Sequence, residues 1–215
     1  MIQIQNFVFN PFLENTYVLH DETKEAIVID PGCYEDHERQ ELVDYIEHHE
    51  LKVVSLLNTH CHIDHVLGNS FVKRQFGVSL WIHAEDEATL KSVEVYAPAY
   101  GFAHFEACEA EKFLMEGEQV HFGNSILDIR YTPGHAPGHV VFLNEAENIC
   151  IGGDVLFDGS IGRTDLPGGD FDTLINSIHS QLFTLNEAMV VYPGHGGTTT
   201  IGKEKVSNPF CAINR

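Results

Sequence analysis

Basic residues are scarce in this sequence, which has 12 lysines and arginines against 32 aspartates and glutamates and a formal net charge of −20. Such a chain repels a phosphate backbone, so we expect no nucleic-acid partner. The sequence also has no apolar run of about 18 residues, and no charged segment followed by an apolar one at its start. We therefore expect neither a membrane span nor a secretory signal.

Cysteine is also limited: there are five, an odd number, and none form a CxxC pair. This usage favours reduced thiols in a cytoplasmic protein. Internal repeats, low-complexity segments and linkers are absent too. Because 215 residues suit one sizeable core, we predict a single domain over residues 1–215.

Segments with strand-like and helix-like patterns are mixed in both halves of the sequence, which predicts a layered α/β architecture. The aromatic segment 96–105 is expected to be a packed surface loop rather than a mobile cover over a site. A helix capped by Asp170 is expected to bury Phe171, Leu174, Ile175, Ile178 and Leu182. Strands are expected at 1–9, 17–19, 26–29, 53–57, 78–82, 120–122, 126–131, 140–143, 148–151 and 189–192, and further helices at 35–49, 66–76 and 85–93.

Histidines and aspartates follow four of these strands, at the point where each strand runs into a polar or glycine-rich turn. If the strands share a sheet, their ends place these side chains along one edge of it. Imidazole and carboxylate groups suit zinc, iron and similar divalent ions. A lone histidine after a strand is usually a loop residue, but the complete set predicts a metal site. Its members are His60, His62, Asp64 and His65 after the strand 53–57, His135 after 126–131, Asp154 after 148–151 and His195 after 189–192.

The segments THCHIDH, TPGHAPGH, GGD and PGH, in this order, resemble the metallo-β-lactamase superfamily. Within that superfamily, the chain looks most like the glyoxalase II group, the hydroxyacylglutathione hydrolases. The likeness covers nearly the whole chain, including the opening ENTYVL and VIDPG. The segments GDVLFDGSIGRTDLPGGD and TTTIGKEKVSNPF are similar to the short bacterial type of this group.

The resemblance implies a four-layer αββα sandwich and two divalent metal ions, with zinc expected first and iron or manganese as alternatives. One ion would be held by His60, His62 and His135. The second would be held by Asp64, His65 and His195, with Asp154 bridging the two. All seven positions carry the residue types that the family pattern requires.

The resemblance also implies a reaction, the cleavage of a small-molecule thioester such as S-D-lactoylglutathione by a metal-bridging hydroxide. Asp64 would orient the nucleophile while it remains a ligand. Arg163 lies where relatives contact glutathione with a basic residue; a substrate carboxylate or an internal ion pair with Asp165 or Asp158 are equally good interpretations. His139 is either a support for the ligands or a loop histidine bonded to the backbone.

Three alternatives stay open. A mononuclear iron persulfide dioxygenase of the same superfamily would use His60, His135 and Asp154, and a lactonase would use the same metal pair with a different pocket. A non-enzymatic metal-binding module is the third. The longer glyoxalase II enzymes carry a helical C-terminal domain; only 20 residues follow His195 here, so we expect that domain to be absent. The sequence leaves the oligomeric state open.

Overall fold

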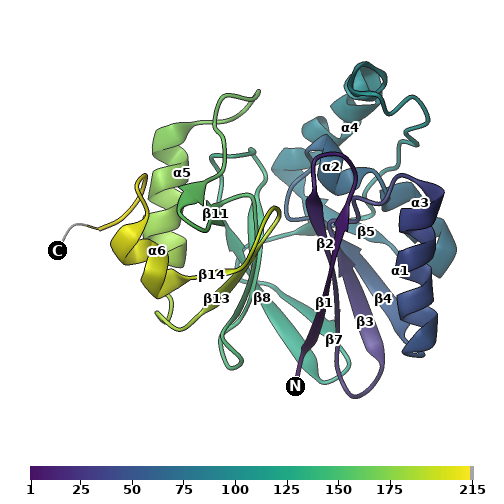
Figure 1. The fold of residues 1–215 in the computed structure, drawn as a ribbon, viewed down its shortest axis with the longest axis horizontal. Coiled ribbons are helices and arrows are strands. Elements are labelled where there is room, and N and C mark those ends of the chain that lie inside the picture. Colours follow the sequence, from purple (N-terminus) through teal and green to yellow (C-terminus); the bar gives the residue numbers. More distant parts are fainter. Residues whose placement is uncertain (214–215) are drawn as a thin grey trace.

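Two mixed β-sheets pack face to face between outer layers of helices in the computed structural model, which describes residues 1–213 (Figure 1). The first sheet has the order β1-β2-β3-β4-β5-β6 and the second the order β14-β13-β10-β9-β8-β7. Helices α1, α3 and α4 cover the first sheet, and α5 and α6 cover the second (Figure 1). This is a layered α/β architecture, as the sequence pattern predicts, and it is the four-layer αββα sandwich that the family resemblance implies.

The first half of the chain builds the first sheet and its helices. Its antiparallel strands are β1 (Gln3–Phe9), β2 (Glu14–His20) and β3 (Glu25–Ile29), after which β4, β5 and β6 pair in parallel. The remaining elements are α1 (Asp36–His48), β4 (Lys52–Leu57), α2 (Ile63–Val66), α3 (Asn69–Phe76), β5 (Leu80–His83), the 3₁₀ turns η1 (Ala84–Asp86) and η2 (Ala97–Tyr100), α4 (Glu87–Tyr96) and β6 (Lys112–Leu114).

The second half builds the other sheet, in which β10 and β13 are parallel neighbours. A small two-stranded sheet, β11 with β12, leads from β10 toward the second helical layer. The elements are β7 (Gln119–Phe122), β8 (Ser125–Tyr131), β9 (Val140–Asn144), β10 (Ile149–Gly153), β11 (Leu156–Phe157), β12 (Ser160–Ile161), α5 (Phe171–Ser177), the π-helical turn η3 (Ile178–Leu182), β13 (Val190–Pro193), β14 (Thr199–Thr200) and α6 (Ile201–Ser207).

Alternation along each central strand divides the core into layers, because successive side chains point to opposite faces of a sheet. In β3, Ile27 and Ile29 pack between the two sheets, whereas Val28 packs under the helices of the first sheet. In β9, Phe142 lies between the sheets and Leu143 lies under α5. Since both faces of these strands are covered, their sequences read as continuous apolar runs.

The expected helix over 66–76 is wrong in one respect, because it is broken at Gly68. A β-carbon at Gly68 would lie 2.5 Å from Cys33 Sγ and 2.8 Å from the carbonyl oxygen of Pro31. The Gly68 N–H donates to that same carbonyl at 2.7 Å. The close approach ends α2 and starts α3 at Asn69, and it holds α2 against the end of β3.

The condition that the four ligand-bearing strands share one sheet is not met, since they divide between two sheets. β4 belongs to the first sheet, whereas β8, β10 and β13 belong to the second. The side chains still meet, because the ends of these strands lie at the same edge of the sandwich (Figure 1).

Two smaller expectations need correction. Phe171 is 47% exposed instead of buried, because it stands at the first position of α5, where a helical side chain leans back past the start of the helix. The 96–105 segment is not only a packed loop: Phe102 is buried, but Tyr96 and Tyr100 line a pocket.

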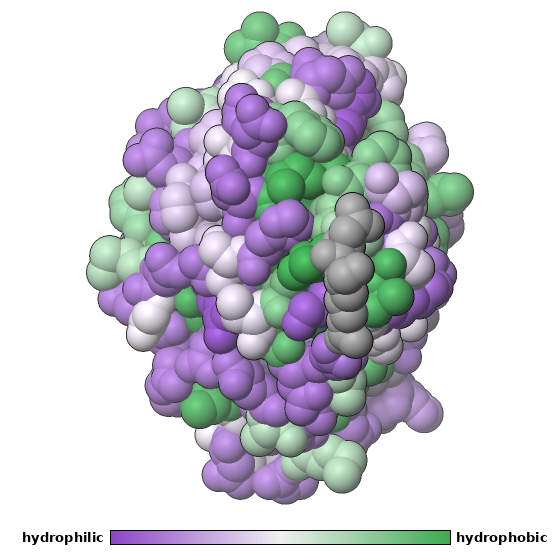
Figure 2. Space-filling model, turned by 90° about the vertical axis from the view of Figure 1, so that its left-hand side faces the viewer, coloured by the Kyte–Doolittle hydropathy of each residue, from purple (hydrophilic) through white to green (hydrophobic). Residues whose placement is uncertain are grey.

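The side of the molecule formed by α5 and α6 carries many hydrophilic residues, with hydrophobic ones exposed between them (Figure 2). Phe171 and Val206 are among the exposed apolar side chains of these helices. None of the helices within residues 1–213 is long and apolar enough to cross a membrane.

Candidate metal centre

Each of the seven predicted ligands lies just beyond the carboxyl end of a strand. β4 leads through residues 58–62 into the short helix α2, so that Asp64 and His65 stand on a helical turn. His135 follows β8, Asp154 follows β10 and His195 follows β13. The structure brings all seven together at one edge of the sandwich.

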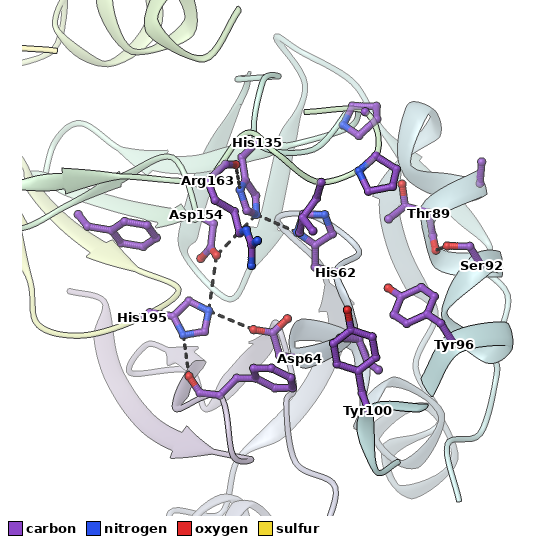
Figure 3. A pocket seen from close by; sticks show the side chains of 18 residues that line it. His62, Asp64, Thr89, Ser92, Tyr96, Tyr100, His135, Asp154, Arg163 and His195 are labelled. Atoms are coloured by element: carbon purple, nitrogen blue, oxygen red, sulfur yellow. Dashed lines mark hydrogen bonds and ion pairs between the residues drawn. The ribbon is translucent and has the colours of Figure 1, made fainter. Parts of the chain in front are cut away.

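The first group of ligands consists of His60, His62 and His135, whose potential ligand atoms all lie within 4.8 Å of one another. His62 Nδ1 is 2.8 Å from His135 Nε2, and His60 Nε2 is 3.2 Å from the same atom. His60 and His135 are buried, and His62 and His135 line the pocket (Figure 3).

The second group consists of Asp64, His65 and His195, again within 4.8 Å of one another. His195 Nε2 lies 3.1 Å from Asp64 Oδ2, and His65 Nε2 lies 3.7 Å from the same oxygen. Asp154 stands between the groups: its Oδ2 is 3.6 Å from His135 Nε2 and 3.5 Å from His195 Nε2 (Figure 3).

Hydrogen bonds at the outer nitrogens show which atoms face the centre. His135 Nδ1 lies 2.8 Å from the carbonyl oxygen of Arg163, which can only accept, so Nδ1 carries the proton and Nε2 a lone pair. Thr59 donates its hydroxyl proton to Asp30, so the Thr59 oxygen accepts from His60 Nδ1 at 3.1 Å. The Nε2 lone pairs of His60 and His135 thus face each other.

Facing lone pairs repel unless a cation lies between them, so the first group fits a divalent ion. The second group fits one as well, because His65 Nε2 and Asp154 Oδ1 are buried and have no hydrogen-bond partner within the described residues. Buried polar atoms without a partner are costly. Imidazole and carboxylate donors in this number suit zinc, iron or manganese.

The electrostatics of the site favour the same interpretation. Burial, followed by the charge of His65, holds the pKa of His60 well below its usual value, so the ring is neutral and able to bind a metal. Burial and His135 lower the pKa of His62 to about 3. Burial acts to lower the pKa of His65, but Asp64 and Asp154 raise it well above its usual range. The carboxylates therefore draw positive charge to the second group.

Two further carboxylates support the ligands, and the sequence reasoning missed both. Asp30 Oδ2 accepts from His65 Nδ1 at 3.2 Å and from the Thr59 hydroxyl at 2.6 Å. Glu14, which is fully buried, places Oε1 at 3.8 Å from His65 Nδ1. Asp30 directly follows the strand β3, which is the same pattern that identified Asp154.

His139 fits both of its sequence interpretations. The ring is fully buried, and its Nε2 accepts the backbone N–H of Asp154 at 3.0 Å. It also stacks on His60, with ring centroids 4.9 Å apart. A histidine bonded to the backbone therefore also holds two ligand positions in place.

Arg163 lines the pocket, but its guanidinium is paired. Nε and Nη2 donate to the two carboxylate oxygens of Asp165 at 2.7 and 2.9 Å. Asp158, the other expected partner, pairs instead with Lys203. Both members of the Arg163–Asp165 pair are more than half exposed, so the pair is held only weakly.

The ligands open onto a pocket of about 790 Å³, which is large enough for a small-molecule substrate. One wall comes from α4 and η2 and carries Tyr96 and Tyr100, which face the ligands across the cavity (Figure 3). Phe12, Phe157, Arg163 and residues 166–168 also line the pocket. The pocket is thus more aromatic and apolar than its polar ligands suggest.

The αββα sandwich and a histidine–aspartate cluster at its edge define a class of metal-dependent hydrolases. The family model described as "Metallo-beta-lactamase superfamily" matches residues 9–195, so the chain belongs to this family. It is 39% identical over 201 residues to the hydroxyacylglutathione hydrolase GloC of Haemophilus influenzae, with 93% of each chain covered.

Solved structures show the same fold. The B3 metallo-beta-lactamase BLEG-1 has a TM-score of 0.89 at 33% identity, covering 98% of this chain and 100% of that one. The protein TTHA1623, in a di-iron-bound form, has a TM-score of 0.85 at 32% identity, with 96% and 99% covered.

Proposed function

We propose that this protein is a dinuclear metal-dependent hydrolase that cleaves a small-molecule thioester such as S-D-lactoylglutathione. The observation that carries the proposal is the arrangement of two three-residue ligand groups on either side of Asp154, open to one pocket. The similarity to GloC supports the thioester as the bond that is cleaved. Zinc is the proposed metal, with iron or manganese as alternatives.

His60, His62 and His135 would hold one ion, and Asp64, His65 and His195 the other, with Asp154 between them. Bound there, two divalent ions supply a hydroxide nucleophile at neutral pH and stabilise negative charge on a carbonyl oxygen. Asp64 is the proposed catalytic residue: its carboxylate faces the pocket beside His195 and can accept a hydrogen bond from the attacking oxygen, which orients it (Figure 3).

The pocket walls would hold the thioester in line with this nucleophile. The aromatic rings of Tyr96 and Tyr100 give apolar contact area opposite the ligands. Arg163 would release Asp165 and bind a substrate carboxylate in its place. Because the Arg163–Asp165 ion pair is exposed, breaking it costs little free energy. A thiolate is a good leaving group, so the reaction needs little assistance from an acid.

The proposed partner is therefore a small molecule, and we propose neither a nucleic-acid nor a membrane partner. The formal net charge of −20 disfavours a phosphate backbone. The five free cysteines agree with the proposed cytoplasmic location, where thiols stay reduced.

The test combines metal analysis with an activity assay on the same purified sample. We expect close to two ions per chain, together with hydrolysis of S-D-lactoylglutathione that is lost on chelation and in His62→Ala. The melting temperature of the variant shows whether it is folded. One iron per chain, oxygen uptake with glutathione persulfide and no thioester cleavage would move the function to the persulfide dioxygenase.

A second candidate function is β-lactam hydrolysis, which the similarity to BLEG-1 favours. The same two ions and the same apolar pocket would serve an amide in a strained ring. A chromogenic cephalosporin, and an acyl lactone for the lactonase alternative, therefore belong in the same assay. If kcat/KM for the cephalosporin or the lactone exceeds that for the thioester, the proposed substrate is wrong, whereas the proposed dinuclear site still stands.

A further inference from the structure

The turn between β1 and β2, residues 10–13, lies against the second group of ligands. The ring of His195 donates its Nδ1 proton to the backbone carbonyl oxygen of Phe12 at 3.1 Å. The side-chain amide of Asn10 donates to the backbone carbonyl oxygen of Asp64 at 3.0 Å. This one turn therefore contacts two of the three residues that would hold the second ion, although it is far from both in sequence.

Asn10 holds the turn in place through every polar group that it offers there. Its backbone N–H donates to Glu38 Oε1 at 2.6 Å, and its Nδ2 also donates to the carbonyl oxygen of Gly32 at 3.1 Å. Its Oδ1 accepts the N–H of Phe12 at 3.0 Å, which fixes the peptide that carries the acceptor for His195. The residue is only 7% exposed.

The backbone of Asn10 has φ +52°, a left-handed conformation that asparagine, aspartate and glycine accept readily. The first group of ligands is held by other parts of the chain. Within residues 1–213, His60 is bonded at Nδ1 by Thr59 and His135 by Arg163, and neither is bonded to the turn. The turn thus acts on one ligand group and not on the other.

We propose that Asn10 is a positioning residue for the second metal position, acting through Asp64 and through the Phe12 carbonyl on His195. This inference rests on the two-ion site of the proposed function. A histidine ligand whose outer nitrogen is held by an acceptor keeps its tautomer and its direction, and loss of such a support weakens metal affinity by about tenfold to a hundredfold.

The same turn connects this position to the pocket. The Phe12 side chain is 41% exposed, lines the cavity and lies 6.3 Å from the Tyr100 ring, centroid to centroid. A substrate that contacts Phe12 therefore touches the residue whose carbonyl oxygen orients His195.

The experiment is a titration of the metal-free chain with Zn²⁺ against a competing chelator, which yields two dissociation constants. The variants are Asn10→Asp, which places an oxygen against two carbonyl oxygens, and Asn10→Gly, which removes the side chain without straining the backbone. Asn148→Asp and Asn148→Gly are the matched controls, because Asn148 has φ +55° in a turn before β10, away from the ligands.

We expect the Zn²⁺ affinity of the first group to be unchanged in both Asn10 variants, whether it is the tighter or the weaker of the two. The affinity of the second group should fall by about tenfold or more. The control variants should leave both affinities unchanged. Phe12→Ala keeps the carbonyl oxygen, so it should also keep both affinities while it raises KM for the thioester.

Two unchanged affinities in the Asn10 variants would overturn the inference, and so would an equal loss at both positions, since that indicates general damage. The melting temperature of the metal-free variants shows whether the substitution has damaged the fold in general. If the wild-type chain binds a single ion, both this inference and the two-ion part of the proposed function fail. Two ions with unchanged affinity in the variants refute this inference alone.

Discussion

At the scale of single residues, the centre depends on the acceptors that hold the outer nitrogens of its histidines. His195 is held by the Phe12 carbonyl, His135 by the Arg163 carbonyl and His65 by Asp30. Backbone carbonyls cannot be replaced by a side-chain substitution. Asp30 is therefore the support that mutation can test most directly.

Asp30→Asn should weaken zinc binding at both positions by about tenfold to a hundredfold. An amide in place of Oδ2 cannot accept from both His65 and the Thr59 hydroxyl, which in turn supports His60. Chelator competition measures the effect. The control is Asp128→Asn, which removes the same charge at a residue of β8 whose carboxylate accepts a hydrogen bond from Gln119. Equal affinities in the wild type and Asp30→Asn would refute the prediction.

Asp21 joins the two sheets at the opposite end and gives a prediction about pH. Burial acts to raise its pKa, but hydrogen bonds from Thr23, Ser125 and Asn124 lower it to about 2. Because the pKa is lower in the folded state, the ionised group stabilises the fold by about 2 kcal/mol above pH ~4, and this contribution is lost as pH falls through ~2.

Urea unfolding of the metal-free wild type and Asp21→Asn should measure this contribution. We expect a difference in unfolding free energy of about 2 kcal/mol at pH 6 that falls to about half at pH 3. Ionisation of the other carboxylates cancels in the comparison as long as they are unaffected by the substitution. A difference that does not change with pH would mean that Asp21 acts through packing and not through its charge.

At the scale of elements, helix breaks and strand ends place the ligands. The break at Gly68 lets α2 approach the loop that follows β3. Gly68→Ala should lower the unfolding free energy by about 1–3 kcal/mol, because its β-carbon overlaps Cys33 Sγ and the Pro31 carbonyl oxygen. Gly197→Ala is the control, since a β-carbon there meets no atom within 4 Å. Thermal or urea unfolding distinguishes the two; a neutral Gly68→Ala would show that α2 shifts freely.

The sequence was most informative for long, periodic or fully buried elements. The strands around Val28 and Phe142 and the helix α1 were predicted within a few residues, because their apolar patterns are strong. The two-residue strands β11, β12 and β14 were missed, since a pair of residues carries no period. The helix α6, Ile201–Ser207, was missed as well, although Thr200 caps it.

The seven ligands were expected from strand ends and from the family resemblance, and the structure brings them together. What surrounds them was not predictable in the same way. Asn10, Glu14 and Phe12 reach the centre from a hairpin far away in sequence. Contacts of that kind depend on how two sheets pack, which no local pattern in one strand encodes.

At the scale of the whole molecule, the ligand cluster joins the two halves of the sandwich. His60, His62, Asp64 and His65 follow a strand of the first sheet, and His135, Asp154 and His195 follow strands of the second. Ions held by these residues would therefore cross-link the two sheets, and binding energy would be added to the stability of the fold.

Zinc at a hundredfold excess over its dissociation constant should stabilise the chain by about 2.7 kcal/mol for one site. For a chain of this size, this predicts a rise in melting temperature of about 5–10 °C over the metal-free protein. Differential scanning calorimetry with and without chelator measures it. Calcium, which prefers oxygen ligands, is the control ion. A melting temperature that zinc leaves unchanged would contradict a cross-linking role.

The distribution of ligands along the chain also has a consequence for synthesis. Four of them are made by residue 65, but His195 follows β13, and the segment with α5 and η3 separates β13 along the chain from its parallel neighbour β10. During translation, the second sheet therefore acquires its last ligand only after the other six ligands have been made. A chain that ends between Asp154 and β13 carries six of the seven side chains, which leaves the second position without His195.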